Sequence, residues 1–129
     1  MVNIDTVKQQ IAGYDVDINI KAKGDQSIFL TIRDRRGNAP PIIMQFVNQD
    51  VYAVEFLNNQ FFELSEDELM LVLNTLLRGT YEVRRNLFGQ GKTIRVPNNI
   101  NQKYILPERT MGKADKELYS RLPLAFTLK

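Results

Sequence analysis

The chain has 129 residues and a net charge of +2, and it contains neither cysteine nor histidine. This composition excludes disulfides, Cys–His zinc sites and any nucleophile that depends on a histidine base. No run approaches the roughly 20 apolar residues that cross a bilayer, and the first residues lack the basic and apolar regions of a signal peptide. We expect one domain over residues 1–129 without cofactor, metal or membrane association, and the compartment is left undetermined.

The charge is unevenly distributed along the chain. Residues 1–83 carry 12 acidic and 7 basic side chains, a net charge of −5, whereas residues 84–129 carry 10 basic and 3 acidic ones, a net charge of +7. A basic region of this kind is typical of proteins that bind polyanions, because Lys and Arg contacts with phosphates release counterions. A soluble surface with unevenly spread charge explains the same distribution, and both interpretations stay open.

The first third of the chain predicts a short helix followed by three strands. Ile4, Val7 and Ile11 stand at helical spacing, which predicts an amphipathic helix over residues 4–12 that Gly13 ends. Alternating apolar and polar residues then predict strands, the first of them with one side facing water. These strands are expected at residues 16–22, 27–33 and 42–47, with a loop at residues 34–41.

Residues 51–79 predict a strand, a turn, a second strand and a helix. Two apolar-rich arms flank Asn58-Asn59, a pair that tolerates the positive φ of tight hairpin turns. Ser65 and Glu68 predict a capping box, and the helix that follows has its apolar residues in one stripe. We therefore expect an α+β fold, in which an antiparallel β-meander carries one well-capped amphipathic helix and is followed by a looser basic C-terminal region.

The residues after that helix are less clearly encoded. Residues 81–88 fit either a short helix or a strand, because both spacings are present, and Gly89-Gln90-Gly91 predicts a turn. Residues 93–96 have an extended pattern. A last helix is expected over residues 114–122, where Pro123 ends it.

Three motifs resemble functional sites, and an ordinary structural role explains each of them. Gly91-Lys92-Thr93 lacks the first glycine of a phosphate loop, because Asn86 stands at that position, and no helix is expected to follow. The acidic residues at positions 63–68 complement the dipole at the start of the helix. Glu117 and Arg121 have the spacing of an ordinary surface salt bridge.

Four basic residues form the candidate nucleic-acid-binding set. They are Arg84, Arg85, Lys92 and Arg95. Tyrosines precede and follow them in the sequence, and nucleic-acid surfaces combine cations for phosphates with aromatic rings for stacking. Solvated positions on an ordinary surface are the alternative.

The order of elements resembles the N-terminal region of the ribosome-inactivating proteins, the ribosomal-RNA N-glycosylases that include ricin-type A chains. The resemblance covers residues 14–122 and consists of short, degenerate pieces. These are Asn48 to Phe56 with alternating Tyr52, Val54 and Phe56, then Phe61-Phe62, Gly79-Thr80-Tyr81-Glu82 and Thr110-Met111-Gly112-Lys113-Ala114.

This resemblance implies an RNA-binding chain that stacks an extruded adenine of ribosomal RNA between Tyr52 and Tyr81. Without it, both tyrosines have the pattern of core residues with their hydroxyls at the rim. The family's Glu-x-x-Arg motif supplies an anion and a proton donor to an oxocarbenium-like transition state, and that motif is not found here in the right context. The catalytic residues are therefore unknown, and the chain alone is expected to be inactive.

The missing motif leaves several origins open, namely a fragment, one part of a processed protein, a shortened relative, or a protein with an unrelated site. The alternative function is a small non-enzymatic protein-interaction module of the immunity or accessory type. Such a module would bind its protein partner through the sheet face or through the basic C-terminal region.

Overall fold

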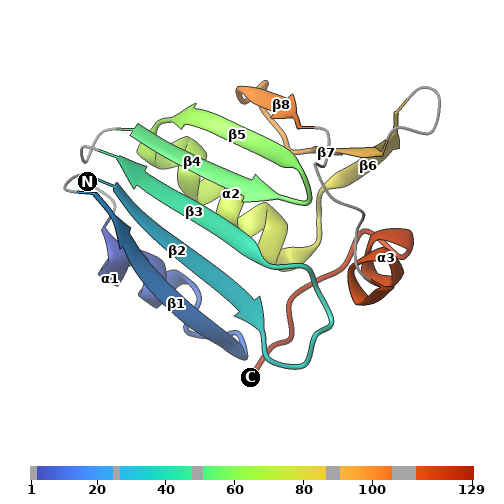
Figure 1. Cartoon of the computed structure of the whole chain (residues 1–129), viewed down its shortest axis with the longest axis horizontal. Coiled ribbons are helices and arrows are strands. Elements are labelled where there is room, and N and C mark those ends of the chain that lie inside the picture. The colour runs from blue at the N-terminus through green and yellow to red at the C-terminus, as the bar shows by residue number, and fades with distance from the viewer. Residues whose placement is uncertain (1–2, 25–26, 48–50, 87–90, 106–112) are drawn as a thin grey trace.

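The structure is a computed structural model that describes residues 3–24, 27–47, 51–86, 91–105 and 113–129 (Figure 1). Its helices and strands follow one another in the chain as α1 (Ile4–Gln10), β1 (Val16–Lys23), β2 (Ser27–Asp34), β3 (Ile42–Val47), β4 (Val51–Phe56), β5 (Asn59–Leu64), α2 (Glu66–Arg78), β6 (Glu82–Arg85), β7 (Lys92–Arg95), β8 (Gln102–Tyr104) and α3 (Lys113–Ser120).

In the described part of the chain, six strands form one antiparallel sheet in the order β1-β2-β3-β4-β5-β8. The helices α1 and α2 both lie behind this sheet in Figure 1, and α2 packs on β4 and β5. Strands β6 and β7 form a separate two-stranded ribbon beside the end of the sheet. The predicted α+β meander with a helix packed on it is confirmed.

The core lies between the sheet and its helices. The register aligns Leu30, Met44, Val54 and Phe61 across four neighbouring strands, and all four side chains are fully buried. The apolar stripe of α2 covers this row, because its inward-facing leucines and valine belong to the same buried cluster. Burial of a large apolar side chain contributes about 1.5–3 kcal/mol, which explains why alternation in the strands and the helical stripe decide the fold.

The predicted central hairpin is confirmed, but its turn lies one residue earlier than expected. Leu57 and Asn58 have φ values of +48° and +65°, whereas Asn59 begins β5 and is fully buried. A turn centred on Asn58-Asn59 would place the Asn59 side chain in solvent. The buried hydrogen bonds of its amide, described below, favour the observed register instead.

Helix α2 has the ends that the sequence predicts. The Ser65 hydroxyl accepts a hydrogen bond from the Glu68 backbone N–H (3.2 Å), and the Glu68 carboxylate accepts one from the Ser65 N–H (3.0 Å). At the other end, Gly79 adopts the left-handed conformation with φ +67°. The capping residues at the two ends supply hydrogen-bond partners or the required backbone conformation, and the helix begins and ends at these residues.

The weaker predictions have mixed outcomes. The first helix and the three early strands are confirmed within a few residues, and residues 81–88 contain a strand, β6, rather than a helix. The last helix spans Lys113–Ser120 and so begins and ends earlier than predicted. Strand β8 has no counterpart among the predicted elements. Residues 89–90 of the expected turn lie outside the described residues, as do positions 110–112 of the resemblance.

The C-terminal segment packs on the domain after α3. Phe126 is buried, and its N–H donates to the Leu77 carbonyl at the end of α2 (2.9 Å). Farther along, the Lys129 N–H donates to the carbonyl of Gly13 (2.9 Å). The last residues therefore pack against α2 and against the segment between α1 and β1.

Candidate nucleic-acid interface

The β6-β7 ribbon gathers the four predicted basic residues into one small element. Its register places Arg85 opposite Lys92 and Glu82 opposite Arg95. Because successive side chains of a strand point to opposite faces, Arg84 and Arg95 share one face of the ribbon with Glu82. Arg85 and Lys92 share the other face.

A single buried amide fixes the base of this ribbon to the main sheet. The Asn59 side-chain NH₂ donates to the carbonyls of Leu57 (3.0 Å) and Lys92 (3.2 Å). Its side-chain oxygen accepts from the N–H of Ile94 and from the side-chain amide of Gln102, both at 3.0 Å. Asn59 therefore joins β5, β7 and β8, a role that sequence reasoning missed because it assigned this residue to a turn.

At the far end of the ribbon, a hydrogen bond joins the first residue after β6 to a glycine before β7. The Asn86 N–H donates to the Gly91 carbonyl (2.9 Å), and the Thr93 hydroxyl donates to the Asn86 side-chain oxygen. Gly91 has φ +93°, and a Cβ atom there would lie 1.9 Å from the Tyr104 hydroxyl. Lys92 and Thr93 then continue as a strand, which confirms that this motif does not open a helix as a phosphate loop must.

Lys92 links the ribbon to α3. Its Nζ donates to the Tyr119 carbonyl (2.8 Å) and lies 4.9 Å from the centre of the Tyr119 ring. Burial raises the pKa of the Tyr119 hydroxyl to about 12, and the neighbouring Tyr104 adds to the effect. Because these contacts occupy the ammonium group, the three arginines remain as the cations of the set that face solvent.

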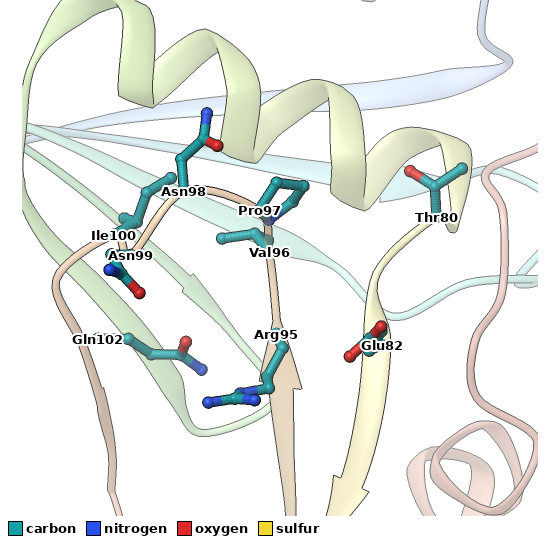
Figure 2. Close-up of a pocket in the computed structure, with 9 residues that line it drawn as sticks. All are labelled: Thr80, Glu82, Arg95, Val96, Pro97, Asn98, Asn99, Ile100 and Gln102. Carbon is teal, nitrogen blue, oxygen red and sulfur yellow. The ribbon is translucent and has the colours of Figure 1, made fainter.

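A pocket of about 460 Å³ lies beside the ribbon, between β6, β7 and the segment that leads to β8 (Figure 2). We call it the ribbon pocket. Charged, amide, hydroxyl and apolar side chains all contribute to its wall. Its lining residues are Thr80, Glu82, Arg95, Val96, Pro97, Asn98, Asn99, Ile100 and Gln102.

The three arginines of the ribbon are exposed and have no acidic partner. In the ranges that the structure describes, Arg84, Arg85 and Arg95 form neither an ion pair nor a side-chain hydrogen bond. Residues directly opposite across a ladder interact, and like charges there are unfavourable. The pairing of Arg85 with Lys92 therefore concentrates positive charge at some cost to the ribbon.

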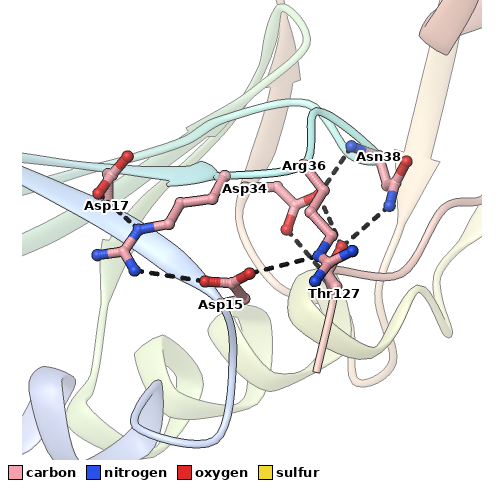
Figure 3. A network of polar contacts seen from close by, with 7 residues as sticks. Asp15, Asp17, Asp34, Arg36, Asn38 and Thr127 are labelled. Carbon is pink, nitrogen blue, oxygen red and sulfur yellow. Dashed lines mark hydrogen bonds and ion pairs between the residues drawn. The ribbon is translucent and has the colours of Figure 1, made fainter. Parts of the chain in front are cut away.

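Two arginines elsewhere in the fold show the contrasting arrangement (Figure 3). After β2, the Arg35 guanidinium lies 2.8 Å from the Asp17 carboxylate and 3.5 Å from that of Asp15. Arg36 also lies 3.5 Å from Asp15. The arginines of this loop thus pair with carboxylates, whereas the described structure gives the ribbon arginines no ion pair.

The two tyrosines that the resemblance assigned to an adenine site are buried. Tyr52 is 2% exposed and packs edge-to-face with Phe46, with the ring centres 5.7 Å apart. Tyr81 is 3% exposed and packs in the same manner with Phe56 at 5.4 Å. Burial raises the pKa of Tyr81, and its hydroxyl accepts a hydrogen bond from the Leu124 N–H (3.0 Å).

The arrangement of these rings gives no support to a stacked adenine. Tyr52 and Phe56 lie on the same face of β4 four residues apart, a distance of about 13 Å along a strand. Tyr81 packs beside Phe56, so the two tyrosines do not face each other across an opening. Both fit the alternative of core residues, and the Tyr81 hydroxyl holds the C-terminal segment.

Comparison with protein-family models, with curated proteins and with solved structures gives no match for this chain. The resemblance to the ribosome-inactivating proteins therefore stays a prediction from sequence. In the residues that the structure describes, no cluster of three or more acidic side chains is placed to hold a metal ion. Within the same residues, no helix has the length and apolar character needed to cross a membrane.

Proposed function

We propose that this chain binds nucleic acid through the β6-β7 ribbon. The observation that carries the proposal is the set of three exposed arginines, each without an acidic partner in the described structure, on one small element. Phosphate groups of a nucleic acid compensate such charges and release bound counterions when they do so. The predicted partner, ribosomal RNA, is the first polyanion to test.

The shape of the ribbon suits this role. Its two strands lie about 4.8 Å apart, which is narrow enough for a two-stranded ribbon to lie in a groove or along a single strand. Arginines stand on both faces, so one phosphate backbone can pass over either side. Asn59 fixes the base of the ribbon, and a fixed base reduces the conformational entropy lost on binding.

Removal of an adenine is not part of this proposal. The tyrosines are buried, and the family's Glu-x-x-Arg motif is not found in the right context. Binding is expected to show a strong dependence on salt, because it rests on phosphate contacts. Specificity for particular bases requires a further site.

The proposal is tested by fluorescence anisotropy with labelled single-stranded RNA, an RNA hairpin from ribosomal RNA, and DNA of the same length, over a salt series. Two or three phosphate contacts give a slope of log K against log salt of about −1.4 to −2 for a single strand. The triple variant R84A/R85A/R95A should lose most of this slope. Arg35→Ala and Arg36→Ala are the matched controls, because those arginines are already paired, and they should leave it unchanged.

Two results would contradict the proposal. One is the absence of binding to any of these nucleic acids at low salt. The other is equal affinity and equal slope for the wild type and the triple variant, since binding would then be carried by another surface.

A protein-interaction role is the second candidate. It is favoured by the uncovered face of the main sheet, by which we mean the face on which none of the described helices packs. In Figure 1, α1 and α2 both lie on the opposite face of the sheet. On the uncovered face, Ile43, Ala53 and Phe62 are only half-buried. Mutation of Ile43 to Glu should abolish capture of a protein partner while it leaves RNA binding unchanged, whereas R84A/R85A/R95A should do the reverse.

A further inference from the structure

The ribbon pocket contains two residues of opposite charge that are paired in the strand ladder but form no ion pair. Glu82 and Arg95 are directly opposite in the ribbon ladder, where Cβ atoms are about 4.5–5.5 Å apart. Opposite charges at such positions commonly attract. In the described structure, however, neither side chain forms an ion pair or a hydrogen bond.

Figure 2 shows where these groups point. The Arg95 guanidinium is turned toward Gln102, while the Glu82 carboxylate stays at the neighbouring strand. The pocket is therefore lined by a planar donor group on β7 and by a carboxylate acceptor on β6. A ligand that offers adjacent acceptors and adjacent donors along one edge can satisfy both groups at once.

The rest of the pocket is suited to a flat, partly polar ring. Gln102 is held rigidly, because its amide NH₂ donates to Asn59 (3.0 Å) and to the Ile94 carbonyl. Only the side-chain oxygen of Gln102 is then left for a ligand. Val96, Pro97 and Ile100 supply apolar wall against which a ring can pack.

Guanine has the edge that this pair of groups requires. Its O6 and N7 atoms are adjacent acceptors that an arginine binds in bidentate fashion. The N1–H and N2–H₂ donors follow next around the ring, and a carboxylate oxygen pair accepts from two such donors. Adenine offers one donor group between acceptors, and cytosine offers one donor group rather than two, so each leaves part of the pair unsatisfied.

We infer that the ribbon pocket binds an unpaired guanine base of the nucleic acid that the ribbon holds, with Arg95 at O6 and N7 and Glu82 at N1 and N2. This inference rests on the proposed function and adds base selectivity to it. Glu82 acts against general polyanion binding, because its charge repels phosphate. Its place beside three arginines is explained if it selects a base.

The test uses single-stranded RNA oligonucleotides that differ in one central base within a uridine tract, again by anisotropy. The central base is guanine, inosine, 7-deazaguanine or adenine. Guanine should bind about tenfold more tightly than adenine. Inosine lacks the N2 amino group and 7-deazaguanine lacks N7, so each should lose part of the preference.

The variants separate selectivity from charge. Glu82→Gln should remove the preference for guanine over inosine while it raises affinity for the adenine oligonucleotide, because one repelling charge is lost. Arg95→Lys should remove the preference for guanine over 7-deazaguanine at unchanged net charge. Arg84→Ala should weaken all four equally and leave their ratios intact. Glu63→Gln, which changes an exposed carboxylate near the end of β5, should preserve the guanine preference.

The outcomes distinguish the two proposals. If all four oligonucleotides bind with the same salt-dependent affinity and Glu82→Gln changes none of the ratios, the guanine site is wrong and the binding function stands. If none of the four binds at low salt, both are wrong.

Discussion

Asn59 shows how one side chain decides the position of a candidate site. It is fully buried and uses both its donor and its acceptor groups, on partners from two other strands and the hairpin turn. A buried polar group is tolerated only when it is hydrogen-bonded. The sequence shows an asparagine next to a turn, and its partners near residues 92–102 are too far along the chain for a local pattern to reveal.

Replacement of Asn59 by alanine should therefore destabilise the protein by about 2–4 kcal/mol. The change leaves the Ile94 N–H, the Lys92 carbonyl and the Gln102 amide without this partner, and an unsatisfied buried group costs about 1–3 kcal/mol. Urea denaturation followed by circular dichroism measures the difference. Asn58→Gly is the control, because glycine adopts the φ of +65° at position 58 readily, and it should change stability by a few tenths of a kcal/mol.

At the scale of elements, the sequence predicted the helices and strands whose signals lie within one short stretch of the chain. Helix α2 was predicted because its capping box and its apolar stripe lie within one short stretch. Residues 81–88 were ambiguous, since a strand on a two-stranded ribbon has no second neighbour to impose alternation, and pairing with β7 decides the outcome. Strand β8 is three residues long and carries too few positions for any period to appear.

Glycine at the end of α2 allows the cost of a left-handed backbone to be separated from the cost of a steric clash. Gly79→Ala places a Cβ atom 2.8 Å from the backbone of Leu124 and Ala125, in addition to a φ of +67°. Gly37→Ala has nearly the same φ, +68°, but nothing lies within 4 Å of its Cβ. The left-handed conformation alone costs about 1–2 kcal/mol, so Gly37→Ala should lower the free energy of unfolding by that amount.

Gly79→Ala should lower the free energy of unfolding by more than Gly37→Ala does, because the C-terminal segment must also move away from α2. Equal melting temperatures for the two variants would show that this segment adapts freely to the added methyl group. The measurement is thermal unfolding of both variants under identical conditions.

At the scale of the whole molecule, the sequence predicted the meander and the helix but not how the chain closes. The basic C-terminal region was expected to be looser, and its end instead lies against α2, where Phe126 is buried. The four basic residues were predicted individually, whereas the ribbon pocket was not. Its lining amides and its one proline, Pro97, lack any pattern in the sequence, and they come together only in the fold.

Asp34 joins the early strands to the C-terminal segment (Figure 3). Its buried carboxylate accepts hydrogen bonds from the N–H (3.1 Å) and hydroxyl (2.9 Å) of Thr127 and from the Asn38 N–H (2.7 Å). Hydrogen bonds to a charged group contribute about 1.5–3 kcal/mol each. Asp34→Ala should therefore destabilise the protein by about 2–4 kcal/mol, because three donors lose a common partner and the losses overlap.

Asp17→Ala is the matched control for that change. Asp17 is 66% exposed and pairs with Arg35 on the surface, and an exposed ion pair contributes about 0–1 kcal/mol. Chemical denaturation of both variants measures the difference, and limited proteolysis shows where the chain opens. In Asp34→Ala, cleavage should begin within residues 121–129, since this segment loses its link to β2. Cleavage that stays unchanged in that segment, together with a loss of stability no larger than that of Asp17→Ala, would show that Phe126 and the backbone bonds hold the closure without the carboxylate.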